Sequence, residues 1–302
     1  HNLDLAQRLV QTAVKRGAVL VSLPECFPFM GRSEADKMKV AEPADGPILG
    51  VFRDLARRHN VTLSLGGFPE RSDDPFYQVY TIPYRDDMVV LDALNYIKDH
   101  VDPTLTYRWS CRMGICGSCG ANIEGTPKLT CSVFLRDLRR QPVTIEPLAN
   151  FPILKDLVVD IEDFMDKLLR VKPYIIREKE KPLERGEYRQ TQEEVDMFRQ
   201  QSLCINCMLC YSACPVYGHD DRFLGPAASA LAYRYLQDSR DEGGDARITA
   251  IASTHGIWQC TFVGECSVVC PKDVDPAGAI QQLKAMAAAK LMKSMLLPLA
   301  SR

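Results

Sequence analysis

The sequence predicts an α+β protein with an α/β segment at its start, a small strand-and-helix domain, and a largely helical C-terminal part. Apolar patterns of helix and strand alternate over residues 1 to 70, which is typical of a layered sheet. A stretch rich in aromatic and β-branched residues follows, and then a helical pattern. All cysteines except Cys26 fall into three tight groups in the later two thirds of the chain.

Length and composition indicate an ordinary globular protein of several domains. With 302 residues the chain is long enough for two or three cores, and we expect domains at 1–70, 71–150 and 151–302. Its net charge of -2 does not favour a nucleic-acid partner. No apolar run reaches the roughly 18 to 20 residues of a membrane span, so we expect any membrane contact to come through a partner.

The first 70 residues contain two helix-like and two strand-like stretches. "LDLAQRLVQTAVKRGA" has the periodicity of an amphipathic helix, and "VLVSL" is typical of a buried strand. "GPILGVFRDLARRH" predicts a second helix and "VTLSLGGF" a second strand. Together they predict part of a layered α/β sheet.

The elements after residue 70 change from strand to helix. "FYQVYTIPY" reads as a strand and "DDMVVLDALNYIKDH" as a helix, while "REKEKPLERGEYRQ" reads as a solvated, charged linker. Thr191 and Glu194 have the spacing of a capping box at the start of a helix. Asp275 and Pro276 mark the start of the final helix.

The first cysteine group has the spacing C-x4-C-x2-C-x11-C. Its members are Cys111, Cys116, Cys119 and Cys131, and this is the plant-type ferredoxin pattern for a 2Fe-2S cluster. Gly114, Gly117 and Gly120 let the loop wrap closely around a cluster. The alternative is a zinc site, although zinc loops more often pair two C-x2-C knuckles.

The second group, "CINCMLCYSACP", has the bacterial ferredoxin spacing, in which the fourth cysteine binds a different cluster from the first three. "CTFVGECSVVCP" fits the same template, with Val263 at the second cysteine position. We therefore expect the fourth cysteines to be exchanged. The predicted ligands are Cys204, Cys207, Cys210 and Cys270 for one cluster, and Cys214, Cys260 and Cys266 for the other.

Three thiolates with a valine at the fourth position do not complete a four-iron cube. The hypothesis is therefore a 3Fe-4S cluster beside Val263, next to a 4Fe-4S cluster. Regular cysteine spacing without a secretory signal also favours metal ligation in a reducing compartment over disulfides.

Long stretches around these cysteines resemble the iron-sulfur subunit of the fumarate reductase and succinate dehydrogenase family. The resemblance rests on "YRWSCRMGICGSCG", "PKLTC", "LANFPILKDLVVD", "KPYII", "CINCMLCYSACP", "GPAASALAYRYLQDSRD" and "CTFVGECSVVCPKDVDPAGAIQQLK". It covers residues from about 71 to 302. "LANFPI" and "CTFVGECS" look more like the fumarate reductase branch.

This resemblance implies a β-grasp 2Fe-2S ferredoxin domain and an α-helical ferredoxin domain with the other two clusters. It also implies a flavoprotein partner with FAD, membrane anchor subunits with quinone, and a peripheral position on the cytoplasmic face of the inner membrane. The chain would relay electrons between flavin and quinone without acting on succinate or fumarate. Lys284 matches a lysine that lies near the quinone in the family, and Pro215 and Trp258 are further candidates.

The N-terminal segment instead resembles a truncated nitrilase. "GAVLVSLPECFPFMG" and "LSLGGFPERSDD" carry the similarity, and the catalytic glutamate of that superfamily corresponds to Glu25. The lysine and cysteine motifs that the hydrolase also needs are missing, so we expect no C-N hydrolase activity. The ferredoxin domain of the family begins with a strand that pairs with the one at "FYQVYTIPY". We expect "VTLSLGGF" to replace it in a hairpin.

Overall fold

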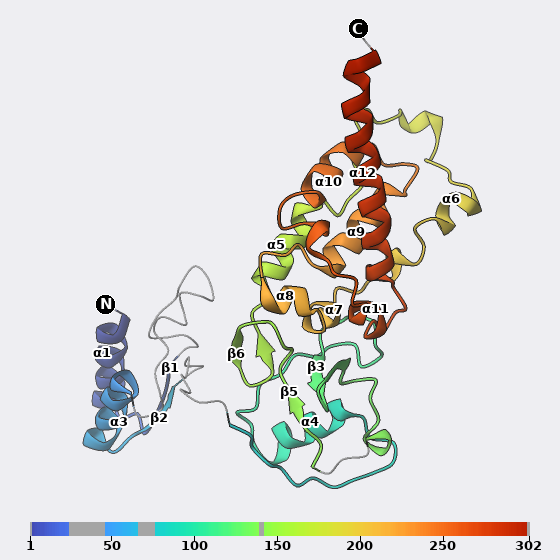
Figure 1. The fold of residues 1–302 in the computed structure, drawn as a ribbon. Helices are drawn as coiled ribbons and strands as arrows, with labels where there is room; N and C mark the ends of the chain where they lie inside the picture. Colours follow the sequence, from blue (N-terminus) through green and yellow to red (C-terminus); the bar gives the residue numbers. More distant parts are fainter. Residues whose placement is uncertain (1, 24–45, 66–75, 139–141, 301–302) are drawn as a thin grey trace. The chain divides into compact units, whose positions relative to one another are not determined.

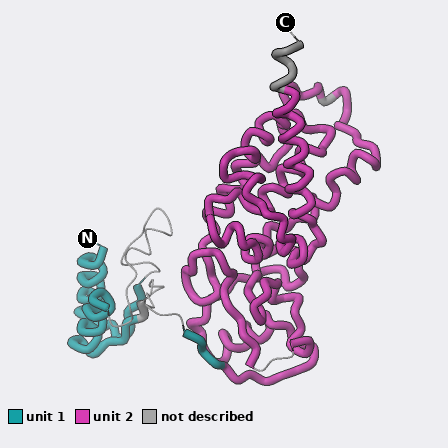
Figure 2. Tube along the Cα trace, in the orientation of Figure 1, with its two compact units in different colours: residues 1–79 teal, residues 80–302 magenta. Residues whose placement is uncertain are grey.

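The computed structural model describes residues 2–23, 46–65, 76–138 and 142–300 (Figure 1). The chain forms two compact units, residues 1–79 and residues 80–302 (Figure 2). Glu25 and Cys26 lie outside the described residues. The domain boundaries at residues 70 and 150 stay predictions.

The first unit contains two helices packed against a short parallel sheet. Its elements are α1 (Asn2–Lys15), β1 (Leu20–Leu23), α3 (Pro47–His59) and β2 (Thr62–Leu65). The helices bury Val10 and Phe52 against Leu23, which confirms the amphipathic pattern of the sequence. Because parallel neighbours need a crossover connection, α3 lies in the chain between β1 and β2.

The expected hairpin between "VTLSLGGF" and "FYQVYTIPY" is wrong. β2 pairs in parallel with β1, with Leu65 opposite Leu23. Residues 76–84 form no helix or strand, and Phe76 and Val79 are 75% and 70% exposed. A strand satisfies its backbone groups through a neighbouring strand, and no described strand pairs with this segment.

The second unit begins with a small antiparallel sheet and one helix. The sheet has the order β4-β3-β5, formed by β3 (Gly120–Ile123), β4 (Thr126–Leu129) and β5 (Ile145–Glu146). Glu124 and Gly125 make the two-residue turn between β3 and β4, both with positive φ. The helix α4 (Val90–His100) packs Val90 and Leu94 against Ile123, which confirms the predicted helix.

The rest of this unit is mostly helical. A hairpin of β6 (Ile153–Lys155) and β7 (Val158–Val159) leads into the helices, which are α5 (Glu162–Arg170), α6 (Gln192–Asp196), α7 (Leu209–Ser212), α8 (Pro215–His219), α9 (Pro226–Leu236), α10 (Gly244–Ile251), α11 (Glu265–Val268) and α12 (Pro276–Ala300). Short 3-10 turns occur at Leu135–Asp137, Leu183–Arg185, Gln201–Leu203 and Ile257–Gln259.

The largest core joins the small sheet to the helical part. Leu129 and Leu148 belong to the same buried cluster as Leu209 and Ala228. The helix α9 packs against α5, α10 and α12, and its alanines allow this close approach. One hydrophobic core therefore spans the small sheet and the helical part, and a separate smaller cluster lies around Val90, Leu94 and Ile123.

Both predicted helix starts are present. The hydroxyl of Thr191 accepts the Glu194 amide at 3.2 Å, and the Glu194 carboxylate accepts the Thr191 amide at 2.7 Å. The carboxylate of Asp275 accepts the Gly278 amide at 2.8 Å at the start of α12. Among the described residues, no helix is long and apolar enough to cross a membrane.

Candidate iron-sulfur centres

The first cysteine group is assembled by one loop and the end of β4. Cys111, Cys116 and Cys119 lie on the loop before β3, and Gly114 and Gly117 turn it with φ of 66° and 72°. The Thr130 amide donates to the carbonyl oxygen of Cys119 at 2.9 Å. This bond brings Cys131, the next residue, alongside Cys119.

Backbone amides in this loop prepare one sulfur atom as a thiolate. The Sγ atom of Cys111 accepts the amides of Met113, Ile115 and Cys116 at 3.5, 3.4 and 3.3 Å. These donors lower the pKa of the Cys111 thiol to about 6. Burial instead raises the pKa of Cys131 to about 11, so its thiol loses a proton when it binds a metal.

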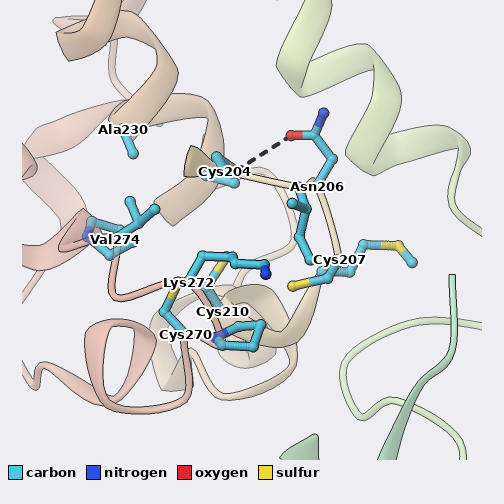
Figure 3. A pocket seen from close by; sticks show the side chains of 13 residues that line it. Cys204, Asn206, Cys207, Cys210, Ala230, Cys270, Lys272 and Val274 are labelled. Carbon is cyan, nitrogen blue, oxygen red and sulfur yellow. Dashed lines mark hydrogen bonds between the residues drawn. The ribbon is translucent and has the colours of Figure 1, made fainter. Parts of the chain in front are cut away.

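A pocket in the helical part brings together Cys204, Cys207, Cys210 and Cys270 (Figure 3). Cys204 and Cys207 lie between the Gln201–Leu203 turn and α7, and Cys210 lies in α7. Cys270 follows α11. Burial raises the pKa of Cys207 to about 12 and that of Cys210 well above its ordinary value. The pocket is therefore a buried, thiol-rich site that draws on both cysteine motifs.

A second pocket is lined by Cys214, Cys260, Cys266 and Val263. Pro215 also lines it. Cys214 comes from the first motif and the other two cysteines from the second, so each pocket receives one cysteine from the opposite motif. Burial raises the pKa of Cys266 to about 12. Val263 contributes no ligand atom where the first pocket has a thiol.

The backbone repeats between the two motifs. Asn206 and Phe262 both have positive φ, 52° and 61°, and Met208 and Gly264 also share a left-handed conformation, at 66° and 89°. A short helix follows in each case, α7 with Cys210 and α11 with Cys266, and these helices pack against each other. This repeat places Val263 at the position that Cys207 occupies in the first motif.

The donor sets fit iron-sulfur clusters. All eleven described cysteines are free of disulfide bonds, and thiolates are the ligands that such clusters use. No group of three or more His, Cys, Asp or Glu side chains suited to a single metal ion occurs in the described ranges. The individual ligand roles stay predictions.

Family comparisons give three matches along the chain. The family "2Fe-2S iron-sulfur cluster binding domain" matches residues 62–166, and the "4Fe-4S dicluster domain" matches residues 200–274. The "Carbon-nitrogen hydrolase" family matches residues 1–103 and so overlaps the first of these. The last match agrees with the nitrilase resemblance of the N-terminal segment.

Similar proteins are iron-sulfur subunits. The "Fumarate reductase iron-sulfur subunit" of Mycobacterium tuberculosis is 58% identical over 230 residues, which is 76% of this chain and 93% of the relative. The chain belongs to the fumarate reductase and succinate dehydrogenase iron-sulfur subunit family. The "Succinate dehydrogenase iron-sulfur subunit" of Paracoccus denitrificans is 39% identical, over 72% of this chain and 84% of the relative.

A solved structure agrees with this assignment. A chain of the "Mycobacterium smegmatis Sdh1 complex in the apo form" has a TM-score of 0.61 and 29% identity, covering 70% of this chain and 89% of that chain. The predicted fold class is confirmed: an α/β segment comes first in the chain, and a 2Fe-2S ferredoxin domain and a helical ferredoxin domain follow it. This oxidoreductase subunit thus carries 2Fe-2S and 4Fe-4S domains, and a 3Fe-4S cluster is typical of its family.

The three candidate quinone residues, Lys284, Pro215 and Trp258, differ in how close they come to the second pocket. The Nζ atom of Lys284 on α12 donates to the carbonyl oxygen of Cys260 at 2.8 Å. Pro215 lines the pocket. Trp258, on the Ile257–Gln259 turn, is exposed and is not among the lining residues.

Sequence reasoning missed the role of Asn150. Its side-chain Nδ2 donates to the carbonyl oxygens of Tyr211, Ser212 and Cys214 at 3.0, 3.0 and 3.3 Å. Asn150 precedes β6, so it ties the sheet region to the C-terminal end of α7, next to Cys214. The stretch "LANFPI" marked this residue only as part of a family resemblance.

Sequence reasoning also missed a close packing of two cysteine loops. A Cβ atom on Gly117 would lie 2.5 Å from the carbonyl oxygen of Ile205 and 3.2 Å from Cβ of Cys207. The loop of the first group therefore lies against the loop that lines the first pocket. The glycine in "CGSC" therefore serves this packing in addition to leaving room for a cluster.

Proposed function

We propose that this subunit relays electrons between the flavin of an FAD-containing flavoprotein subunit and quinone at a membrane anchor. Its 2Fe-2S ligands are Cys111, Cys116, Cys119 and Cys131. Its 4Fe-4S ligands are Cys204, Cys207, Cys210 and Cys270, and its 3Fe-4S ligands are Cys214, Cys260 and Cys266. The observation that carries this proposal is the exchange of Cys270 and Cys214 between the two pockets.

Iron-sulfur clusters, when bound, accept and release single electrons without making or breaking a substrate bond. The chain arranges its cysteines as a series for this purpose. Gly117 packs the first loop against Ile205 and Cys207. Cys210 lies in α7 and Cys214 caps the start of the next helix, α8. Because Cys210 lines the first pocket and Cys214 the second, the two pockets are neighbours. This supports the order 2Fe-2S, 4Fe-4S, 3Fe-4S.

Exposed apolar side chains near each end of the series support contacts with other subunits. Met113 and Ile115 are exposed beside Cys116 on the first loop, where we place the flavoprotein. Phe262 lines the second pocket, Val268 lies at the end of α11, and both are exposed. Here we place the membrane anchor and quinone, with Lys284 as a quinone contact. The subunit would then lie peripherally on the cytoplasmic face of the inner membrane.

Paired substitutions of the exchanged cysteines test the ligand sets. C270A and C210A should remove the same electron paramagnetic resonance signal, that of the reduced four-iron cluster. C214A and C266A should instead remove the three-iron signal. If C270A removed the three-iron signal together with C266A, the exchange would be wrong.

The relay is tested on the subunit assembled with its flavoprotein and anchor partners. Succinate should reduce the clusters through the flavoprotein, and fumarate should reoxidise them, as followed by visible absorbance. Higher identity to the fumarate reductase relatives than to the succinate dehydrogenase one favours fumarate reduction as the faster direction. Clusters that stay oxidised with succinate and the flavoprotein would contradict the relay.

A further inference from the structure

A lysine side chain lines the pocket of the four predicted four-iron ligands. Lys272 follows Cys270 and Pro271, is half-buried, and lines this pocket with its amino nitrogen pointing inward (Figure 3). Within the described part of the chain, its side chain has no hydrogen bond and no ion pair. The cation thus faces the pocket of thiols without a carboxylate partner.

The repeated motif has a lysine at this position in one of its two copies only. The residue at the same place after the first motif is Val216, which follows Cys214 and Pro215 and lines the second pocket. The second pocket also contains Glu265 among its lining residues, where the repeat of the first motif has Leu209. The backbones of the two pockets are therefore similar, whereas the charged lining residue is Lys272 in the first pocket and Glu265 in the second. Lys284 also lies near the second pocket, where its amino group is held by the carbonyl oxygen of Cys260.

We propose that Lys272 raises the reduction potential of the four-iron cluster relative to a pocket without this charge. Reduction adds one electron to the cluster, with no bond formed or broken, and makes the site more negative by one charge. A nearby ammonium stabilises the more negative state, and its Coulomb attraction is stronger in a partly buried pocket than in bulk water. Net charge around a cluster is one of the factors that set its potential. The inference rests on the proposed ligand set.

The test is a redox titration of the full subunit with its clusters bound, followed by electron paramagnetic resonance. K272Q should lower the midpoint potential of the four-iron cluster. At the wild-type midpoint, the ratio of reduced to oxidised cluster should then fall up to about tenfold. A tenfold change corresponds to about 59 mV for one electron. K272R should stay near wild type, and the three-iron midpoint should change less.

K290Q is the matched control, because it also removes one positive charge, from the exposed pair of Lys290 with Asp245. The inference would be overturned if the midpoint potential of the four-iron cluster in K272Q equalled that of the wild type or of K290Q. If K272Q lost the four-iron cluster, retention in K272R would support the role of charge, and loss in both would overturn it.

The same experiment separates this inference from the ligand assignment. A wild-type protein without a four-iron signal, or one that keeps the signal in C210A, would contradict the ligand set. An unshifted midpoint in K272Q with the signal intact would contradict only the role of Lys272.

Discussion

Gly117 and Ile205 meet backbone to backbone, since a Cβ atom on Gly117 would lie only 2.5 Å from the carbonyl oxygen of Ile205. The first residue belongs to the 2Fe-2S loop and the second to the loop of the neighbouring pocket. Real Cβ atoms do not approach an oxygen this closely, so any side chain at position 117 must push the loops apart. The absence of a side chain thus sets the spacing between two cofactor sites.

G117A should lengthen the distance between the first two clusters and slow electron transfer between them. The magnetic interaction between the reduced clusters, measured by their spin relaxation, should weaken. G125A is the matched control, because Gly125 has a similar φ of 75° but open space around it. G125A should have the same backbone strain as G117A, roughly 1 to 2 kcal/mol, but no clash with a neighbouring loop. Equal relaxation in both variants would contradict the spacing role.

N150A should destabilise the end of α7 and broaden the three-iron signal. It removes the contacts of one NH2 group with three backbone carbonyls. Because this group has two hydrogens, the contacts amount to about two full hydrogen bonds of roughly 1 kcal/mol each, so we expect a loss of roughly 2 kcal/mol. Asn150 also has a φ of 69°, which alanine adopts less readily than asparagine. N150G removes the amide without this strain. A melting temperature near wild type in N150G would show that the amide contributes little.

V263C should favour a four-iron cube in the second pocket. The backbone repeat places residue 263 where Cys207 stands in the other motif, so a thiol there supplies the missing ligand. We expect the three-iron signal to fall, a second four-iron signal to appear, and quinone-linked turnover to slow. V263A, which adds no ligand, should keep the three-iron signal. An unchanged three-iron signal in V263C would contradict the template.

R247M should destabilise the second unit by about 3 to 5 kcal/mol, because it leaves a buried carboxylate without its partner. The guanidinium of Arg247 is fully buried, pairs with Asp241, and donates to the carbonyl oxygens of Val171, Lys172 and Tyr174. Thermal unfolding measures the loss.

The control for this substitution is R85Q, which breaks the exposed pair of Arg85 and Asp87. Exposed ion pairs contribute little, so its melting temperature should stay close to that of wild type. A similar, small change in R247M would show that the buried network is not important for stability.

The sequence by itself determined the elements whose signals are local. Cysteine spacing indicated three cluster sites, because ligands on one loop must sit at fixed intervals. The capping box of Thr191 and Glu194 and the helix start at Pro276 were also predicted correctly, since each depends on neighbouring residues. The position of Val263 followed from comparing two copies of one motif.

Only the tertiary structure decided which distant segments meet. It paired β2 with β1 rather than with residues 76–84, because backbone hydrogen bonds of a strand go to whichever strand the fold brings alongside. It brought Asn150 to three carbonyl oxygens, Gly117 to Ile205, and Lys272 into a pocket of thiols. These contacts join residues far apart in the chain, and no local pattern of residue types specifies such a meeting.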